Sequence, residues 1–355
     1  MVPPSHFDWF EEQLKQLEIP KDVFVEDVYE YLLQKESSQS KSEEYKCCCC
    51  TSKTISEFDT RKYNRYDDIL YYLKTLAVQY SSTSTRVELI DHGITEQNRE
   101  LVYLKISRGD ATNKPVIVIE GGINPREWIT IPSALNVIER VIEQELYLDA
   151  FDWIIAPVVN PDGYEYTHTN LRLWMKSRST RSNLGFICPG VNINRNFDVD
   201  WLNFDSSSSP CSHLYGGVAP FSEVETQLIR DVVQEYGNRI KLYISLQNNG
   251  GFISYPWSYE RAASGMFRQN HLLGLDMIKS LNDSYKIDVA AVAFDRASGT
   301  SSDYARINDV LYTYNFDIAD RGDGVIIPEE DIHSIVDDVW EAIATAATEM
   351  IRLYL

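Results

Sequence analysis

The sequence lacks several features that would place it in a membrane or on nucleic acid. It contains no run of about 18 or more apolar residues, the length that a membrane-spanning helix needs, so we expect no transmembrane segment. The opening residues, MVPPSHFDWF, lack the basic region and apolar core of a signal peptide. Basic residues are also scarce, because 33 Lys and Arg stand against 53 Asp and Glu, for a net charge of −20. Such a charge repels phosphate and argues against nucleic acid or an anionic membrane as a partner.

Cysteine is rare and unevenly placed. Four of the six cysteines form the run from Cys47 to Cys50. This run matches no zinc-site spacing, because adjacent thiolates cannot all reach one tetrahedral ion without strain. Cys188 and Cys211 lie 23 positions apart in a Ser-rich segment. That spacing suits a loop-closing disulfide in an oxidising compartment, and it suits two reduced thiols equally well.

The chain is long enough for one large or two modest domains. It has 355 residues, and its 44% hydrophobic content supports a sizeable core. Residues 1–34 predict a small helical segment, in which Ser5 caps a helix through FDWFEEQLKQLE and DVYEYLLQK continues at helical spacing. Residues 35–58 form a predicted polar linker that holds the cysteine run. We assign residues 59–355 to the main domain and detect no internal repeat.

The main domain alternates helical and strand-like stretches. RYDDILYYLKTLAVQY is an amphipathic helix, and RVELIDHG with ELVYLKIS predicts a hairpin. The further predicted strands are KPVIVIE, DWIIAPVV, KLYISLQ, DVAAVAF and VLYTYNFDI. The further predicted helices are IPSALNVIERVIEQEL, SEVETQLIRDVVQEY, one near 264–281 and one from Pro328 to about Leu353. This pattern predicts an α/β fold with a mixed, mostly parallel twisted sheet and helices on both faces.

Polar segments follow several of these strands. In open sheets, ligands bind at the carboxyl ends of strands. The segments at these ends are INPRE, NPDG, QNNGG and DIADRG. We therefore expect the functional site where these four segments meet.

Four long motifs resemble the zinc metallocarboxypeptidases of the carboxypeptidase A and B type. They are NPDGYEYTHTNLRLWMKSRS (160–179), GVNINRNFDVDW (190–201), SPCSHLYGG (209–217) and APFSEVETQLI (219–229). Residues 2 to about 35 are similar to the last part of that family's activation segment. The resemblance implies a carboxypeptidase-like fold, an extracellular location, a monomer, and a site that releases C-terminal amino acids by zinc-assisted hydrolysis.

Part of the family's site is retained. By resemblance, Glu127 stands at the position of the glutamate zinc ligand, and the neighbouring Arg126 at that of a substrate-binding arginine. Asn194 and Arg195 match the pair that grips the substrate's terminal carboxylate, for which arginine offers bidentate geometry. Ser302 aligns with the base of the side-chain pocket, where a small polar residue fits neither a basic-selective nor a plainly apolar-selective enzyme.

The other positions are replaced. Asn124 and Gln247 stand where the two histidine ligands belong, and Met175 stands where the oxyanion-stabilising arginine belongs. Asp295 takes the position of the mobile tyrosine, and Asp317 that of the general-base glutamate. Amide carbonyls are weak, neutral ligands for zinc. Replacing two of three ligands should cost on the order of 10² to 10⁴ in affinity or activity.

The replacements predict a protein that has lost zinc and catalysis. We expect no cofactor, and the family's peptide chemistry makes peptide or protein C-termini the expected partners. The alternative is an active metallocarboxypeptidase with zinc, or another metal, in an altered site. A third hypothesis is a storage or structural protein that binds no ligand.

Overall fold

The computed structural model describes residues 7–16, 30–31, 58–109, 113–281, 285–318 and 324–354. Spatial contacts divide the chain into two units, Met1–Cys47 and Cys48–Leu355. In the first unit, helix α1 (Phe7–Gln16) forms where FDWFEEQLKQLE predicts one. The predicted cap Ser5, most of DVYEYLLQK and all but the last residue of the predicted linker lie outside the described residues.

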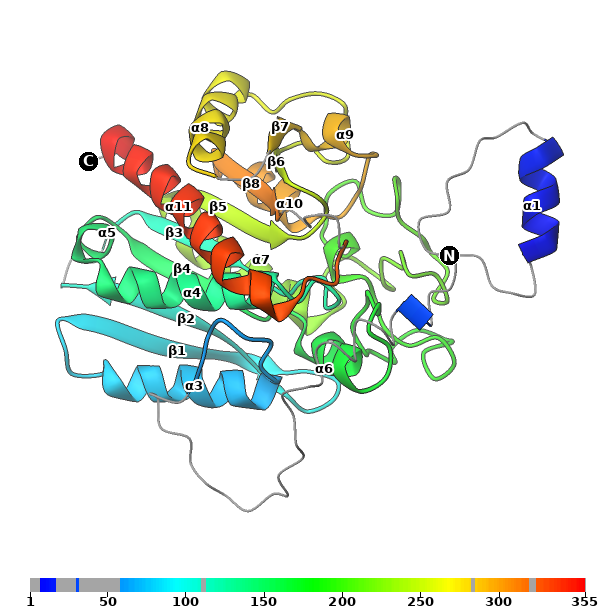
Figure 1. The fold of residues 1–355 in the computed structure, drawn as a ribbon, viewed down its shortest axis with the longest axis horizontal. Coiled ribbons are helices and arrows are strands. Elements are labelled where there is room, and N and C mark those ends of the chain that lie inside the picture. Colours follow the sequence, from blue (N-terminus) through cyan, green and yellow to red (C-terminus); the bar gives the residue numbers. More distant parts are fainter. Residues whose placement is uncertain are drawn as a thin grey trace, which may run out of the picture. The chain divides into compact units, whose positions relative to one another are not determined.

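The described part of the second unit is built on a mixed eight-stranded sheet (Figure 1). The strand order is β1-β2-β4-β3-β5-β8-β6-β7. The strands are β1 (Thr85–Ile94), β2 (Glu100–Arg108), β3 (Val116–Glu120), β4 (Asp152–Ala156), β5 (Ile240–Gln247), β6 (Phe252–Tyr255), β7 (Lys286–Val289) and β8 (Tyr312–Asp317). The four central strands, β4, β3, β5 and β8, are mutually parallel. The β1–β2, β2–β4 and β6–β8 pairs are antiparallel, so the predicted mixed, mostly parallel sheet is confirmed.

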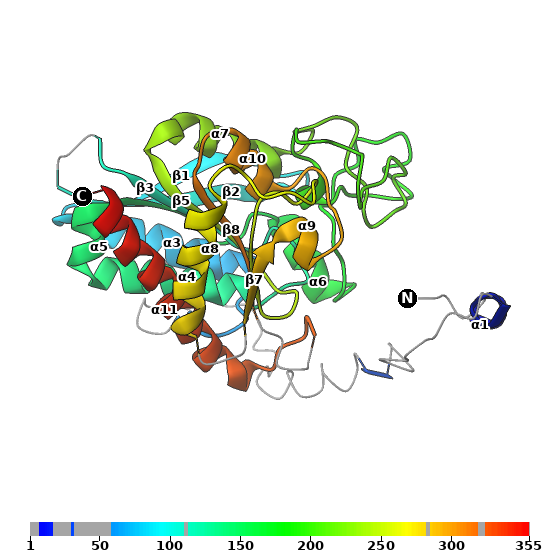
Figure 2. The same ribbon diagram turned by 90° about the horizontal axis from the view of Figure 1, so that it is seen from above.

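Helices cover both faces of the sheet (Figure 2). One face carries α3 (Tyr66–Gln79), α4 (Thr130–Glu143), α5 (Glu145–Ala150), α8 (Phe267–Lys279) and α11 (Glu329–Tyr354), and the other carries α7 (Val224–Tyr236) and α10 (Ser301–Ile307). Strand β3 is buried along its whole length. Ile117 and Ile119 pack into the core of the first face, and Val116 and Val118 into that of the second. Two-sided burial explains why this strand is a continuous apolar run rather than an alternating pattern.

The edge of the sheet beyond β8 differs from the prediction. The segment DVAAVAF was predicted as one strand, but β7 ends at Val289 and the chain continues as helix α9 (Ala290–Ala293). Alanine has the highest helix propensity of any residue, so the alanines of this segment favour a helix over an extension of the short strand. Strand β6 was not predicted, because four residues between a Gly-Gly pair and a proline give too short a pattern.

Two further stretches differ from the prediction. The NPDG segment, predicted only as a polar segment after a strand, begins helix α6 (Pro161–Thr169). The Asn160 side chain caps this helix by accepting a 2.9 Å hydrogen bond from the Gly163 amide. The single helix predicted over IPSALNVIERVIEQEL divides at Gln144, whose extended backbone separates α4 from α5.

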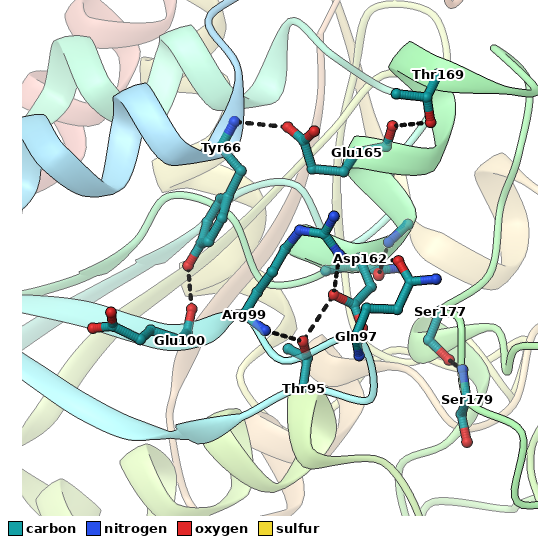
Figure 3. Close-up of polar contacts among 12 residues, drawn as sticks. Tyr66, Thr95, Gln97, Arg99, Glu100, Asp162, Glu165, Thr169, Ser177 and Ser179 are labelled. Atoms are coloured by element: carbon teal, nitrogen blue, oxygen red, sulfur yellow. Dashed lines mark hydrogen bonds and ion pairs between the residues drawn. The ribbon is translucent and has the colours of Figure 1, made fainter. Parts of the chain in front are cut away.

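A buried carboxylate ties α6 to the turn between β1 and β2 (Figure 3). The Asp162 side chain accepts hydrogen bonds from Thr95 Oγ1 at 2.8 Å, the Gln97 amide at 2.9 Å and Arg99 Nη1 at 2.8 Å. Asp162 is fully buried, and a buried charge must be paired and hydrogen-bonded to be tolerated. The hairpin and α6 are therefore held together at the side of the sheet that carries the strand ends.

Candidate functional site

Parallel strands bring the predicted site residues to one edge of the sheet. Gln247 ends β5 and lies directly opposite Asp317, which ends β8. Glu120 ends β3 on the other side of β5, and the turn that holds Asn124 and Glu127 follows it. The carboxyl ends of β3, β5 and β8 thus meet, as expected for ligand binding in an open sheet.

A Gly-Gly pair lets the turn after β3 fold closely over the sheet. A Cβ atom on Gly121 would lie 2.8 Å from the Thr130 carbonyl oxygen, and Gly122 has a φ of +64°. Only glycine meets both conditions without strain. The Glu127 amide then donates to the Asn124 carbonyl at 3.1 Å, which closes the turn and brings these two side chains together.

The three residues at the ligand positions are joined to one another. The side-chain amide nitrogen of Asn124, Nδ2, donates to Glu127 Oε1 at 3.1 Å and to Gln247 Oε1 at 2.6 Å. Gln247 Nε2 donates to Ser245 Oγ at 2.7 Å, and the Asn248 amide donates to Glu127 Oε2 at 2.9 Å. We call this set of five residues the amide network. Both side-chain N–H groups of Asn124 are directed at the other two ligand positions. A metal ligand in the place of Asn124 would instead direct a lone pair there.

Burial raises the pKa of the two carboxyl groups at the ligand and general-base positions. Glu127 is 4% exposed, and burial raises its pKa to about 7, although Arg126 and the hydrogen bond from Asn248 lower it. Asp317 is 5% exposed, and burial, together with the charge of Glu127, raises its pKa well above the usual range. Desolvation is the larger cause in both cases, because it disfavours the ionised form.

The donor set does not fit a zinc site. Zinc sites in proteins use imidazole, thiolate and carboxylate ligands, whereas these positions supply one carboxylate and two amides. Within the described residues, no three His, Cys, Asp or Glu side chains gather as a metal-binding group. In the amide network, the side-chain NH2 group of Asn124 instead lies between the other two side chains and donates to both.

The residues aligned with the carboxylate clamp are engaged elsewhere. Arg195 donates to the Asp205 carboxylate at 2.6 Å, to the Asp205 carbonyl at 2.7 Å and to the Asn194 carbonyl at 2.7 Å. The Asn194 side-chain oxygen accepts from the Ser301 amide at 3.0 Å. The charge of Arg195 is therefore balanced by Asp205, a residue that no sequence pattern connects to it.

A cavity of about 350 Å³ opens beside the amide network. Five of the predicted site residues line it: Asn194, Arg195, Gln247, Asp295 and Asp317. The wall also includes Asp205, Thr300 and residues of β6, α9 and β8. Its volume is within the range of ligand pockets in proteins.

Five of the predicted ligand, substrate-binding and oxyanion residues lie outside the lining of this cavity: Asn124 and Glu127, described above, and Ser302, Met175 and Arg126. Ser302 is fully buried, and its hydroxyl lies 3.4 Å from that of Thr300. Met175 is half-buried and carries no hydrogen-bond donor. Arg126 precedes Glu127 in the turn, and its backbone carbonyl accepts from Arg172 Nη1 at 2.5 Å.

Three further residues, which no sequence motif indicates, shape the site. Ser245 lies two positions before Gln247 in β5, so the two-residue period of a strand predicts a shared face. Asn248 follows Gln247 directly, and its backbone amide, rather than its side chain, reaches Glu127. Asp205 lies in a loop, and its pairing with Arg195 has no sequence signal.

A disulfide fastens the loops on this side of the molecule. Cys188 and Cys211 are bonded to each other, with Cα atoms 4.8 Å apart. The bond closes a loop with a sequence separation of 23. Within the part of the chain that the structure describes, no helix has the length and apolarity needed to cross a membrane.

Comparison with known proteins identifies relatives of this chain. A family model described as zinc carboxypeptidase matches residues 69–342. Carboxypeptidase B of Helicoverpa zea is 33% identical, over 98% of this chain and 83% of the relative, and carboxypeptidase B of Astacus astacus is 33% identical, over 81% and 97%. The crystal structure of carboxypeptidase A from Helicoverpa armigera matches with a TM-score of 0.90 at 29% identity, covering 99% of this chain and 88% of that chain. The family match, the two relatives and the shared fold together show that this chain belongs to the zinc carboxypeptidase family.

Proposed function

We propose that this protein keeps the carboxypeptidase fold without zinc-dependent hydrolysis and uses its cavity to bind peptide or protein chains. The observation that carries the proposal is that the side-chain amide nitrogen of Asn124 donates to both Glu127 and Gln247. A zinc ion at this place would have to displace two hydrogen bonds and accept two neutral amide oxygens in place of imidazoles. The amide network is thus a stable alternative to a bound metal.

The remaining replacements support the same proposal. Met175 offers no charge to a developing oxyanion, and losing one such donor alone costs about 10² to 10³ in rate. Asp317 carries a carboxyl group one methylene shorter than glutamate at the general-base position. Because metal, oxyanion and base positions all differ, no single change would restore the family's chemistry.

Binding, rather than catalysis, is supported by the open cavity at the strand ends. Peptides are the ligands that the family's cleft accommodates, so we propose peptide or protein chains as partners. The Cys188–Cys211 disulfide supports an extracellular location, because such bonds persist in oxidising compartments.

Metal analysis and a peptide assay test this proposal together. The full chain is loaded with excess zinc, dialysed and analysed for metal, and is then incubated with peptides that carry each class of C-terminal residue. We expect zinc well below one ion per chain and no release of C-terminal amino acids. One tightly held zinc per chain with measurable release would instead establish an active enzyme with an altered site.

Thermal unfolding in the presence of a peptide library separates binding from a purely structural role. We expect some peptides to raise the melting temperature, because a ligand that binds only the folded state stabilises it. A melting temperature that no peptide changes would favour the storage or structural hypothesis.

A further inference from the structure

The segment QNNGG at the end of β5 contains the one Asn-Gly pair in the sequence, Asn249-Gly250. An asparagine followed by glycine can lose its side-chain amide without an enzyme, because glycine has no side chain that keeps its backbone nitrogen away from the asparagine Cγ atom. Hydrogen bonds to the reacting groups suppress this reaction in a folded protein. The fate of Asn249 therefore depends on how the structure holds this turn.

The first asparagine of the segment is held firmly, and the second is not. Asn248 is buried, and its backbone amide donates to Glu127 Oε2 at 2.9 Å. The side-chain nitrogen of Asn248 donates to the Ile318 carbonyl at 3.0 Å. In the described part of the chain, no hydrogen bond holds the Asn249 side chain or the Gly250 backbone amide. The two groups that must react are therefore free to approach each other.

The backbone beyond Asn249 leaves room for that approach. Asn249 and Gly250 are both exposed, so water reaches them. Gly250 has a φ of +97°, and none of the described residues would have an atom within 4 Å of a Cβ atom placed on it. The chain is fixed again only at Gly251, whose carbonyl accepts from the Lys286 amide at 3.1 Å. Asn249 and Gly250 thus form an unanchored exposed step between two anchored residues.

We propose that Asn249 is a site of spontaneous deamidation that changes the charge of the cavity as the protein ages. The deprotonated backbone nitrogen of Gly250 attacks Asn249 Cγ, and the new C–N bond closes a cyclic succinimide. The side-chain nitrogen leaves as ammonia, which takes up through solvent the proton that Gly250 lost. Water then adds to either ring carbonyl, and the C–N bond at that carbonyl breaks. The product is aspartate or isoaspartate, and no oxidant or reductant takes part.

The new carboxylate joins the wall of the cavity, because Asn249 is one of its lining residues. Arg195 is the one basic residue among the described lining residues, and it is already paired with Asp205 at 2.6 Å. A neutral amide is thus replaced by a negative charge that no free basic group of that wall balances. Aged molecules should repel anionic groups from the cavity more strongly than new ones do. This inference does not depend on whether the cavity binds peptides.

Peptide mass spectrometry on the aged full chain tests the proposal. The folded protein is kept at physiological temperature at pH 6 and pH 8, digested with trypsin under mildly acidic conditions, and the peptide 242–261 is sequenced. A sample taken at time zero corrects for the digestion. We expect Asn249 to lose its amide progressively, and several-fold faster at pH 8, because the attacking nitrogen must be deprotonated. Asn248, in the same peptide, should keep its amide because its side-chain nitrogen is hydrogen-bonded.

Two references show whether the fold leaves Asn249 unprotected. The first is the synthetic peptide LQNNGGFIS, which has the sequence of residues 246–254 without the fold. We expect the folded protein to react within about tenfold of the rate of this peptide, because a hydrogen bond to a reacting group would slow it by up to that factor and none is present. The second is the pair Asn183 and Asn238, which are also exposed but are followed by leucine and arginine. Both should keep their amides over the same time.

Substitutions assign the change in charge to this residue. On isoelectric focusing, the aged wild type should develop an acidic band that migrates with freshly made Asn249→Asp. Asn249→Ser should develop no such band, whereas the matched control Asn183→Ser should develop it at the wild-type rate.

Either of two results would overturn the proposal. One is an Asn249 amide that is still intact in the folded protein after the synthetic peptide has been converted, since the fold would then protect it. The other is an acidic band that appears in Asn249→Ser as fast as in the wild type. Neither result bears on hydrolysis, and zinc binding with C-terminal release would refute the proposed function without affecting this one.

Discussion

Because Glu127 is buried, its raised pKa should make the free energy of unfolding depend on pH. Glu127→Gln replaces a buried carboxyl group with a neutral amide of the same shape. The ordinary pKa of this group is 4.5, and burial raises it to about 7 in the folded protein. Between these pH values the folded protein holds a proton that the unfolded chain has released. The stability contributed by that proton is fully present below about pH 4.5 and is lost as the pH rises to about 7.

The size of the effect follows from the pKa difference. At 1.36 kcal/mol for each pH unit, the interval from 4.5 to about 7 corresponds to about 3 kcal/mol. The variant does not bear this cost, because the new amide stays neutral at every pH. It also removes the charge that helps to raise the pKa of Asp317. We therefore expect the difference in free energy of unfolding, Glu127→Gln minus wild type, to increase by about 2 to 3 kcal/mol as the pH rises from 5 to 8.

The amide network accommodates the new side chain. Asn124 and Gln247 both carry side-chain amides, and rotation of an amide group by 180° exchanges the positions of its oxygen and its NH2 group. If both rotate, the new amide donates to Asn124, Gln247 donates to Asn124, and the Ser245 hydroxyl donates to Gln247. The hydrogen bond from the Asn248 amide to the remaining oxygen is kept. Every member of the network keeps a partner.

Urea unfolding at pH 5, 6, 7 and 8, in buffer with a chelator, measures the difference between the two proteins. Glu341→Gln, which removes an exposed carboxylate on α11, serves as the control. A difference between Glu127→Gln and wild type that does not change with pH, or a variant that is less stable at pH 8, would refute the reasoning. Repeating the series with zinc checks that no metal binds the wild-type site.

Three further predictions concern the site and its supports. Asn124→His combined with Gln247→His should raise zinc affinity by on the order of 10² or more, measured by calorimetry, and an unchanged affinity would contradict our account of the ligand positions. Cys188→Ser combined with Cys211→Ser should lower the free energy of unfolding by about 3 kcal/mol, the chain-entropy value for a loop with this separation; urea unfolding without any loss would show that the bond carries no stability. Asp162→Asn should cost about 2 to 4 kcal/mol, because its buried carboxylate accepts three hydrogen bonds, and amide exchange in the β1–β2 turn should quicken.

Periodicity and local motifs were sufficient to predict the architecture. The apolar runs that became β3, β4, β5 and β8 are continuous because both faces of these strands are buried. The long amphipathic helices could be predicted for the same reason, since each must bury one face. Short elements such as β6 and α9 could not, because four residues do not establish a period.

The sequence by itself also determined which residue types stand at the strand ends, including the amides of Asn124 and Gln247. Only the tertiary structure decided what those residues do to one another. Parallel strands end together, so residues more than 100 positions apart meet. For this reason the side-chain amide nitrogen of Asn124 bridges Glu127 and Gln247. Likewise, Asp205 neutralises Arg195 through a loop that has no periodic relation to it. Contacts of this kind depend on chain topology and burial, which local sequence patterns do not encode.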